Sequence, residues 1–266
     1  MNEPKKKFKI VTDTRARVLL PNTLTLIGVC IGLSSINFAL NQNFKLAIVA
    51  ILFAAIIDGL DGRIARLIKG TSKVGKELDS LTDVISFGVA PAFIMYFWIL
   101  NSLGKIGWLL SLMHVICVAL RLARFNINTN SEPSWRDNFF EGVPSPAGGI
   151  LVLSPLIYDV SGLGIFSLNY QFITPIIFVL TSILLISKIP TYSLKKIIVP
   201  RSSTVFLLFG IILLFGLLLI FTFKALAIGC VFYLFLIPAS VIHFLKLKKD
   251  FKNESKLNDQ EPEDVL

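Results

Sequence analysis

Long apolar runs constrain most strongly what this chain can fold into. A helix needs roughly 20 apolar residues to cross the hydrocarbon core of a membrane, and about 17 suffice. Only 16% of the 266 residues are charged, against about 25% in a typical soluble domain. We therefore predict an all-α polytopic membrane protein with about eight transmembrane helices, near residues 23–40, 44–61, 83–101, 104–122, 144–160, 172–188, 204–222 and 225–244.

The basic residues predict how these helices are oriented. If both termini lie on one side, that side holds all 26 Lys and Arg residues except Lys45, Lys105 and Lys224. Cytoplasmic loops of membrane proteins carry such an excess of Lys and Arg. Both termini are therefore expected in the cytoplasm. The net charge of +9 then reflects topology and attraction to anionic membrane lipids, so no binding to nucleic acid is expected.

One stretch places several carboxylates at the mouth of the second predicted span. Residues 58–83 read DGLDGRIARLIKGTSKVGKELDSLTD. Fourteen helical residues from Phe44 advance the second helix by about 21 Å, less than the roughly 30 Å of a membrane core, so Asp58 and Asp61 are expected slightly inside the membrane. These two residues share one helical face, and Asp79 and Asp83 share a face on the next helix. Two helices joined by a short loop can therefore direct four carboxylates into one gap.

The residue types in this gap predict a site for hard divalent cations. Four carboxylates in a medium of low dielectric constant repel one another unless cations lie among them. Ligation by oxygen alone favours Mg²⁺ or Mn²⁺ over zinc, and the three cysteines and two histidines are scattered. Two such ions can hold a diphosphate, and Gly62 and Gly75 would let a nucleotide approach the backbone. The alternative is that the carboxylates are ordinary charges at the membrane interface.

Eight positions in this stretch also match a known signature without departure. They follow the spacing D-x2-D-G-x2-A-R-x8-G-x3-D-x3-D, and the stretch resembles the motif of the CDP-alcohol phosphotransferases, which displace CMP from a CDP-linked donor with an alcohol. The resemblance implies a two-metal site whose ligands are Asp58, Asp61, Asp79 and Asp83. Asp83 would also be the base for the incoming hydroxyl group. The cytidine diphosphate site would be lined by Gly62, Ala65, Arg66 and Gly75.

Stretches outside the motif resemble the phosphatidylserine synthases within this family. They are LPNTLTL, ALRLARFN, EGVPSPAGG and IPTYSLKK. The resemblance implies CDP-diacylglycerol as the donor and L-serine as the acceptor, with phosphatidylserine and CMP as products. It further implies a homodimer in the bacterial inner membrane whose active site faces the cytoplasm.

Four further residues are candidates for substrate binding. Arg121 and Arg124 end the fourth predicted span one turn apart, and a guanidinium group suits a carboxylate or a phosphate. The alternative is that both arginines only anchor the helix at the cytoplasmic surface. Asn22 and Thr25 open the first span and are candidates to face the nucleotide, although Asn and Thr are also common where helices start.

The resemblance, together with the charge and composition of the two ends, divides the chain into four segments. Residues 1–20 form a basic cytoplasmic arm, and residues 21–203 form a catalytic membrane core of six helices. Residues 204–245 add two transmembrane helices. The polar, charge-mixed tail at 246–266 is expected to be disordered in the cytoplasm.

Two other functions stay open from sequence alone. The same chemistry with glycerol 3-phosphate or an inositol phosphate would need extra cationic partners, which Arg121 and Arg124 can supply. A cation-coupled transporter is the more distant alternative, because carboxylates within membranes also line ion paths. The carboxylates cluster on one predicted side, with Asp159 alone on the other, and this favours an enzyme at the membrane surface.

Overall fold

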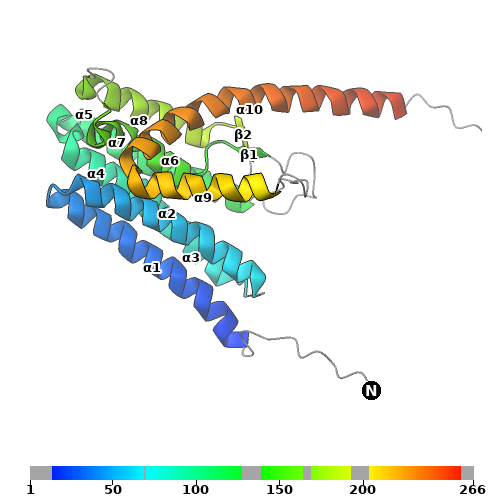
Figure 1. The fold of residues 1–266 in the computed structure, drawn as a ribbon, viewed down its shortest axis with the longest axis horizontal. Coiled ribbons are helices and arrows are strands. Elements are labelled where there is room, and N and C mark those ends of the chain that lie inside the picture. Colours follow the sequence, from blue (N-terminus) through cyan, green and yellow to red (C-terminus); the bar gives the residue numbers. More distant parts are fainter. Residues whose placement is uncertain (1–13, 69, 128–138, 164–168, 193–203, 259–266) are drawn as a thin grey trace, which may run out of the picture.

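A computed structural model describes residues 14–68, 70–127, 139–163, 169–192 and 204–258 of the chain. The fold is helical, as expected, apart from one short pair of strands (Figure 1). In order, its elements are α1 (Thr14–Leu40), α2 (Phe44–Leu67), α3 (Lys73–Asp83), a π-helical turn (Val84–Val89), α4 (Ala90–Trp98), a 3₁₀ turn (Leu100–Leu103), α5 (Lys105–Ile127), β1 (Phe139–Glu141), α6 (Ser145–Val152), α7 (Ser154–Ser161), α8 (Tyr170–Ile186), β2 (Pro190–Tyr192), α9 (Thr204–Ile220) and α10 (Thr222–Asn258).

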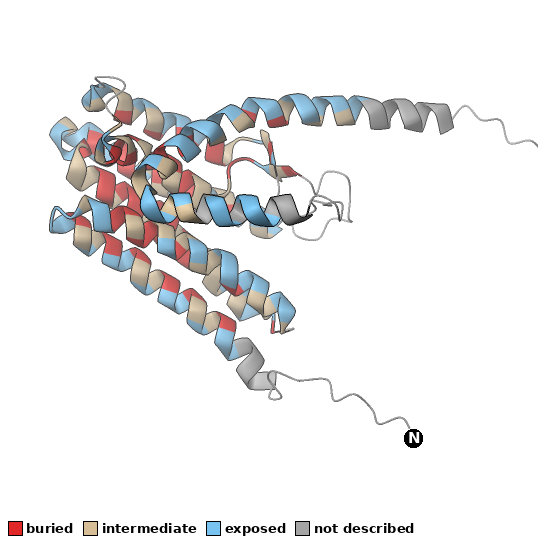
Figure 2. Cartoon of the chain, in the orientation of Figure 1, coloured by how far each residue is buried: buried red, intermediate tan, exposed pale blue. Residues whose placement is uncertain are grey.

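The apolar helices support an integral membrane protein. Among the described residues, four helical segments are long and apolar enough to cross a membrane: Leu19–Leu40, Lys73–Trp98, Lys105–Ile127 and Thr222–Lys249. Of the other predicted spans, α8 and α9 contain 17 residues each, and α2 carries charged residues near its C-terminal end. Large apolar side chains are exposed along α9 and α10, as a lipid-facing surface requires (Figure 2). The total of eight spans and their orientation stay predictions.

The middle of the chain forms one long helix with a changed pitch. The elements α3, the π-helical turn and α4 follow one another without a break from Lys73 to Trp98, so this helix begins ten residues before the expected span at 83–101. Ser72 caps it, because its hydroxyl accepts a hydrogen bond of 2.9 Å from the Gly75 N–H. The helix therefore carries the second half of the aspartate motif in its first turns.

Two features of the core depart from a simple row of spans. The predicted fifth span is divided into α6 and α7 at Ser154, because Pro155 lacks the N–H that would continue the helix. Strands β1 and β2 pair antiparallel, with Phe139 opposite Tyr192 and Glu141 opposite Pro190. This pair was not expected from an all-α pattern. It joins the segment before α6 to the segment after α8.

The C-terminal helix extends further than the sequence suggested. We expected residues 246–266 to be disordered, but α10 continues to Asn258 and projects beyond the rest of the fold (Figure 1). The physical reason is that no Gly or Pro follows Pro238 before Pro262, while Lys, Leu and Glu favour helix. At its membrane end, α10 packs on α7 and β2, and it contributes Ala227, Cys230 and Ile237 to the buried core. The helix therefore contributes both to the buried core and to the exposed apolar surface.

Candidate active site

The two halves of the aspartate motif lie on neighbouring helices held together by α1. α1 packs along α2 and also contacts α3. The contact with α3 is close at Gly75, where an added Cβ would lie 2.8 Å from Asn22 Oδ1 and 3.0 Å from Ser72 Oγ. Asn22 therefore meets the start of α3, and Gly75 has a packing reason to lack a side chain. This geometry brings the last turns of α2 beside the first turns of α3.

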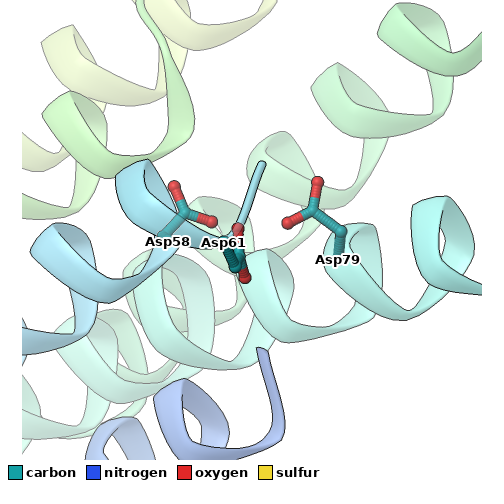
Figure 3. A group of neighbouring side chains, drawn as sticks. All are labelled: Asp58, Asp61 and Asp79. Carbon is teal, nitrogen blue, oxygen red and sulfur yellow. The ribbon is translucent and has the colours of Figure 1, made fainter. Parts of the chain in front are cut away.

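Three of the four motif aspartates converge as their spacing predicted. Asp58 and Asp61 on α2 and Asp79 on α3 place carboxylate oxygens within 4.8 Å of one another (Figure 3). Asp61 is buried, and its Oδ2 accepts a hydrogen bond of 2.7 Å from Thr25 Oγ1 on α1. Thr25 thus fixes the direction of one carboxylate in the group. A small pocket beside these residues is also lined by Gly28, Ser86 and Phe87.

Asp83 lies next to the three aspartates and also contacts residues of other helices. Its carboxylate adjoins that of Asp58, while Ser145 lies within hydrogen-bonding reach on the other side. Arg121 Nη1 donates a hydrogen bond of 2.7 Å to Ser145 Oγ. Asp83 Oδ1 is buried and has no hydrogen-bond partner within the described part of the chain. Asp83 therefore joins the three aspartates to a second polar cluster, formed by Ser145 and Arg121.

The chemistry of this cluster fits hard divalent cations. The charges that act on Asp58 and Asp79 are those of other aspartates, and among the described residues only Asp83 has a basic side chain, Arg121, near it. Carboxylates gathered in this way favour a bound cation that offsets their repulsion. The donor set holds oxygen atoms only, as Mg²⁺ and Mn²⁺ prefer, and the unpartnered Asp83 Oδ1 leaves room for a further contact.

The motif residues assigned to the nucleotide lie around the end of α2. Gly62 is exposed, and outside its own stretch of α2 no described atom lies within 4 Å of where a Cβ would be. Ala65 is half-buried, and exposed Arg66 donates a hydrogen bond from Nε to the Gly62 carbonyl at 3.1 Å. The surface beside Asp61 is therefore open at Gly62.

The two arginines of α5 have different partners. Arg121 reaches Ser145 beside the aspartates, whereas Arg124 Nη1 donates a hydrogen bond of 2.6 Å to the Ile186 carbonyl at the end of α8. Arg121 Nε is buried and has no partner among the described residues. The separation follows from packing, because α6 and α8 both contact α5. Arg121 therefore has spare hydrogen-bonding capacity near the site, while Arg124 ties two helices together.

Tyr233 was not predicted to lie at the site, and two interpretations of Ser145 stayed open. The Pro-Ser-Pro triplet at the start of α6 is consistent either with a pocket or with a helix start, and the structure places Ser145 beside Asp83. Tyr233 lies on α10, near Arg121 and beside Thr191, and its buried hydroxyl forms no hydrogen bond of good geometry with described residues. No local pattern identifies Tyr233, because it reaches the site only through the packing of α10.

Comparison with known proteins gives one consistent family. The profile of the CDP-alcohol phosphatidyltransferase family matches residues 18–235. Proteins named CDP-diacylglycerol–serine O-phosphatidyltransferase are 40% identical over 185 residues in Mycobacterium leprae (68% of this chain, 61% of the relative), 45% over 141 residues in Helicobacter pylori strain 26695 (53% and 58%) and 35% over 162 residues in Bacillus subtilis (60% and 89%).

The relatives are matched over part of their length, whereas the family profile is matched over most of this chain. The chain spans less than two thirds of the length of the mycobacterial relatives, so their complete activity is not carried over by similarity alone. The family match, in contrast, extends over most of the chain and includes every motif aspartate as well as Arg121, Ser145 and Tyr233. The chain belongs to the CDP-alcohol phosphatidyltransferase family.

Proposed function

We propose that this protein transfers the phosphatidyl group of CDP-diacylglycerol to the hydroxyl group of L-serine, which gives phosphatidylserine and CMP. The observation that carries the proposal is the aspartate cluster of α2 and α3, with Asp83 between it and the Ser145–Arg121 pair. The names of the relatives in Mycobacterium, Helicobacter and Bacillus support the donor and the acceptor.

The aspartates would hold the divalent cations that bind the diphosphate end of the donor. Asp58, Asp61 and Asp79 would be the first ligands, and Thr25 keeps Asp61 in a fixed direction. Two Mg²⁺ or Mn²⁺ ions, when bound, supply positive charge that stabilises the phosphates and the departing CMP. Gly62 leaves space for the nucleotide at the exposed end of α2, and Ala65, Arg66 and Gly75 complete its binding surface.

Asp83 is the base in this mechanism. Its unpartnered Oδ1 accepts the proton of the serine hydroxyl while the serine oxygen attacks the phosphorus atom that carries diacylglycerol. A P–O bond to serine forms as the P–O bond to CMP breaks, and CMP leaves with the electron pair. Ser145 lies beside Asp83 and helps to direct its carboxylate. Transfer therefore proceeds in one displacement.

Arg121 binds the carboxylate of serine. Its Nη1 is held by Ser145, and its buried Nε has no partner among the described residues, so a donor remains for an anionic ligand. Arg124 is engaged with the Ile186 carbonyl. A phosphorylated acceptor carries about two negative charges and needs more than one cation. Arg121 is the basic side chain found beside Asp83 within the described part of the chain, and one cation of this kind suits the single carboxylate of serine.

The membrane arrangement follows from the sequence and the family. We propose eight transmembrane helices, both termini in the cytoplasm and the active site at the cytoplasmic face of a bacterial inner membrane. The excess of Lys and Arg on the predicted cytoplasmic side supports this orientation. A homodimer surrounded by membrane lipids is part of the proposal and rests on the family resemblance.

Acceptor choice is the experiment that tests this function. The purified protein in detergent and lipid receives CDP-diacylglycerol and Mn²⁺, with labelled serine, glycerol 3-phosphate or inositol phosphate in separate reactions. Label that enters the chloroform phase from serine alone supports the proposal, and label from another acceptor overturns it. The inactive control is Asp83→Asn, and its matched control is Asp159→Asn, a carboxylate on α7 outside the cluster.

A further inference from the structure

The π-helical turn immediately after Asp83 has an unusual hydrogen-bonding problem. In an α-helix, the Phe87 carbonyl would accept a hydrogen bond from the N–H of residue 91. Residue 91 is proline and has no N–H. The N–H of Ala90 bonds to the Ile85 carbonyl, one residue further back than in an α-helix. Residue 91 therefore offers the Phe87 carbonyl no donor, and a side chain from another helix can take its place.

His114 on α5 provides that donor. Its side chain is fully buried, and its Nε2 lies 3.2 Å from the Phe87 oxygen. A carbonyl oxygen only accepts hydrogen bonds, so Nε2 carries the hydrogen and the ring is the Nε2–H tautomer. Nδ1 has no hydrogen-bond partner within the described part of the chain. The edge of the ring meets Phe178 on α8, with centroids 5.7 Å apart. The imidazole is thus held in one orientation toward the turn.

Two glycines close the remaining sides of the same turn. A Cβ at Gly32 on α1 would lie 3.1 Å from Ser86 Cα, and a Cβ at Gly149 on α6 would lie 3.0 Å from the Phe87 oxygen. Ser86 and Phe87 also line the pocket beside Asp58 and Asp61. The turn is therefore fixed by α1, α5 and α6 and forms one wall of the site. Asp83 is the residue from which this turn starts.

We propose that His114 is a positioning residue for the active site. Its hydrogen bond to the Phe87 carbonyl stabilises the π-helical turn, and the turn sets the direction of Asp83 toward Ser145. The expected effect of His114 on activity rests on the proposed function, whereas its effect on the turn does not. The turn itself can be observed by backbone hydrogen exchange, which does not depend on the reaction.

The test combines substitutions at His114 with one at Pro91. His114→Leu removes the donor, and His114→Gln keeps an N–H donor on a side chain of similar reach. Leu110→Ala, at another buried position of α5, is the matched control for a loss of packing alone. Pro91→Ala returns an N–H to residue 91, so the Phe87 carbonyl gains a donor from its own helix.

Each variant is measured by hydrogen exchange of the amides from 84 to 90 and by steady-state kinetics. We expect His114→Leu to speed exchange in this segment by about tenfold or more. We expect it to lower kcat by about tenfold or more with little change in either KM, because a small misplacement of a reacting group is costly. His114→Gln should recover most of both losses. Leu110→Ala should change neither the exchange at 84–90 nor kcat.

The double variant decides between positioning and general packing. With Pro91→Ala in place, His114→Leu should cost much less protection at 84–90 than it does alone, since the two donors serve one carbonyl. Additive effects of the two substitutions would overturn the proposal. Equal losses in His114→Gln and His114→Leu would overturn it as well. If neither the wild type nor any variant transfers the phosphatidyl group to serine, the proposed function is wrong. The exchange data still test the role of His114 in the turn.

Discussion

Thr25 Oγ1 donates a hydrogen bond of 2.7 Å to Asp61 Oδ2, which joins α1 to the aspartate cluster. The same hydroxyl also lies 3.1 Å from the Pro21 carbonyl within α1. The side chains of Thr25 and Asp61 are both buried. From the sequence, Thr25 was a candidate to face the nucleotide or an ordinary residue at a helix start, whereas this contact gives it a part in orienting a carboxylate. Such outer contacts keep metal ligands in position before a cation arrives.

Removing the Thr25 hydroxyl should weaken cation binding. Thr25→Val keeps the shape of the side chain, so we expect the Mn²⁺ concentration at half-maximal activity to rise about tenfold, as for other losses of outer-shell contacts. Thr25→Ser keeps the hydroxyl and should behave like the wild type. Direct Mn²⁺ binding measured by electron paramagnetic resonance checks the same change without turnover. Equal Mn²⁺ affinity in Thr25→Val would show that α1 does not orient Asp61.

Asp83→Asn should abolish transfer and leave the protein folded. The amide has nearly the same shape but is a poor proton acceptor, so we expect kcat to fall by about 10²–10⁴-fold. Binding of CDP-diacylglycerol should be retained, because Asp58, Asp61 and Asp79 remain. Turnover within a few-fold of the wild type would remove Asp83 as the base. Equilibrium binding of the labelled donor separates this outcome from a loss of the substrate site.

Metal removal should stop the reaction reversibly. Four carboxylates with one nearby arginine need cations to hold a diphosphate, so EDTA should bring transfer to background. Mg²⁺ or Mn²⁺ added in excess should restore it, whereas Ca²⁺, which prefers more ligands and longer bonds, should restore less. Full activity after thorough chelation would contradict the proposed metal site.

Gly62→Ala tests whether a nucleotide approaches the end of α2. Apart from the neighbouring turns of α2 itself, no atom of the described residues lies within 4 Å of the added methyl group. Alanine also stabilises a helix over glycine by about 0.5–1 kcal/mol, so folding should not suffer. If CDP fills this space, we expect the KM for CDP-diacylglycerol to rise about tenfold. Gly59→Ala, also on α2 and also in open space, is the matched control and should leave this KM unchanged. Equal constants in the two variants would place the nucleotide elsewhere.

The sequence predicted those parts of the molecule that depend on local pattern. Apolar runs and face-matched aspartates identified the helical class and the convergence of Asp58, Asp61 and Asp79, because helical periodicity decides which side chains share a face. The family resemblance is confirmed. Ser145 and the β1–β2 pair depend on contacts between distant segments, which no local period encodes. The length of α10 was missed because charge was taken as a sign of disorder, although Lys, Leu and Glu also favour helix.

The π-helical turn illustrates the same limit. The span predicted at 83–101 runs straight through Pro91, so no irregular turn was expected there. The consequence of Pro91, a carbonyl at Phe87 that requires a donor, becomes visible only once His114 from α5 lies beside it. Neither the irregular turn nor the side chain that compensates for it was therefore predicted from the sequence.

Arg121→Lys and Arg124→Lys should separate binding of the acceptor from helix packing. Lysine keeps the charge but loses the fork-shaped donor, so Arg121→Lys can no longer hold both Ser145 and a carboxylate. We expect the KM for serine to rise about tenfold or more, in line with the loss of a charged hydrogen bond, and the KM for CDP-diacylglycerol to change little. Arg124→Lys loses the contact with the Ile186 carbonyl and should lower the Tm without raising the KM for serine. A larger effect of Arg121→Lys on the donor would mean that Arg121 binds the phosphate of CDP-diacylglycerol. Unchanged constants in both variants would leave the arginines as anchors at the membrane surface, and the carboxylate of serine would then need another partner.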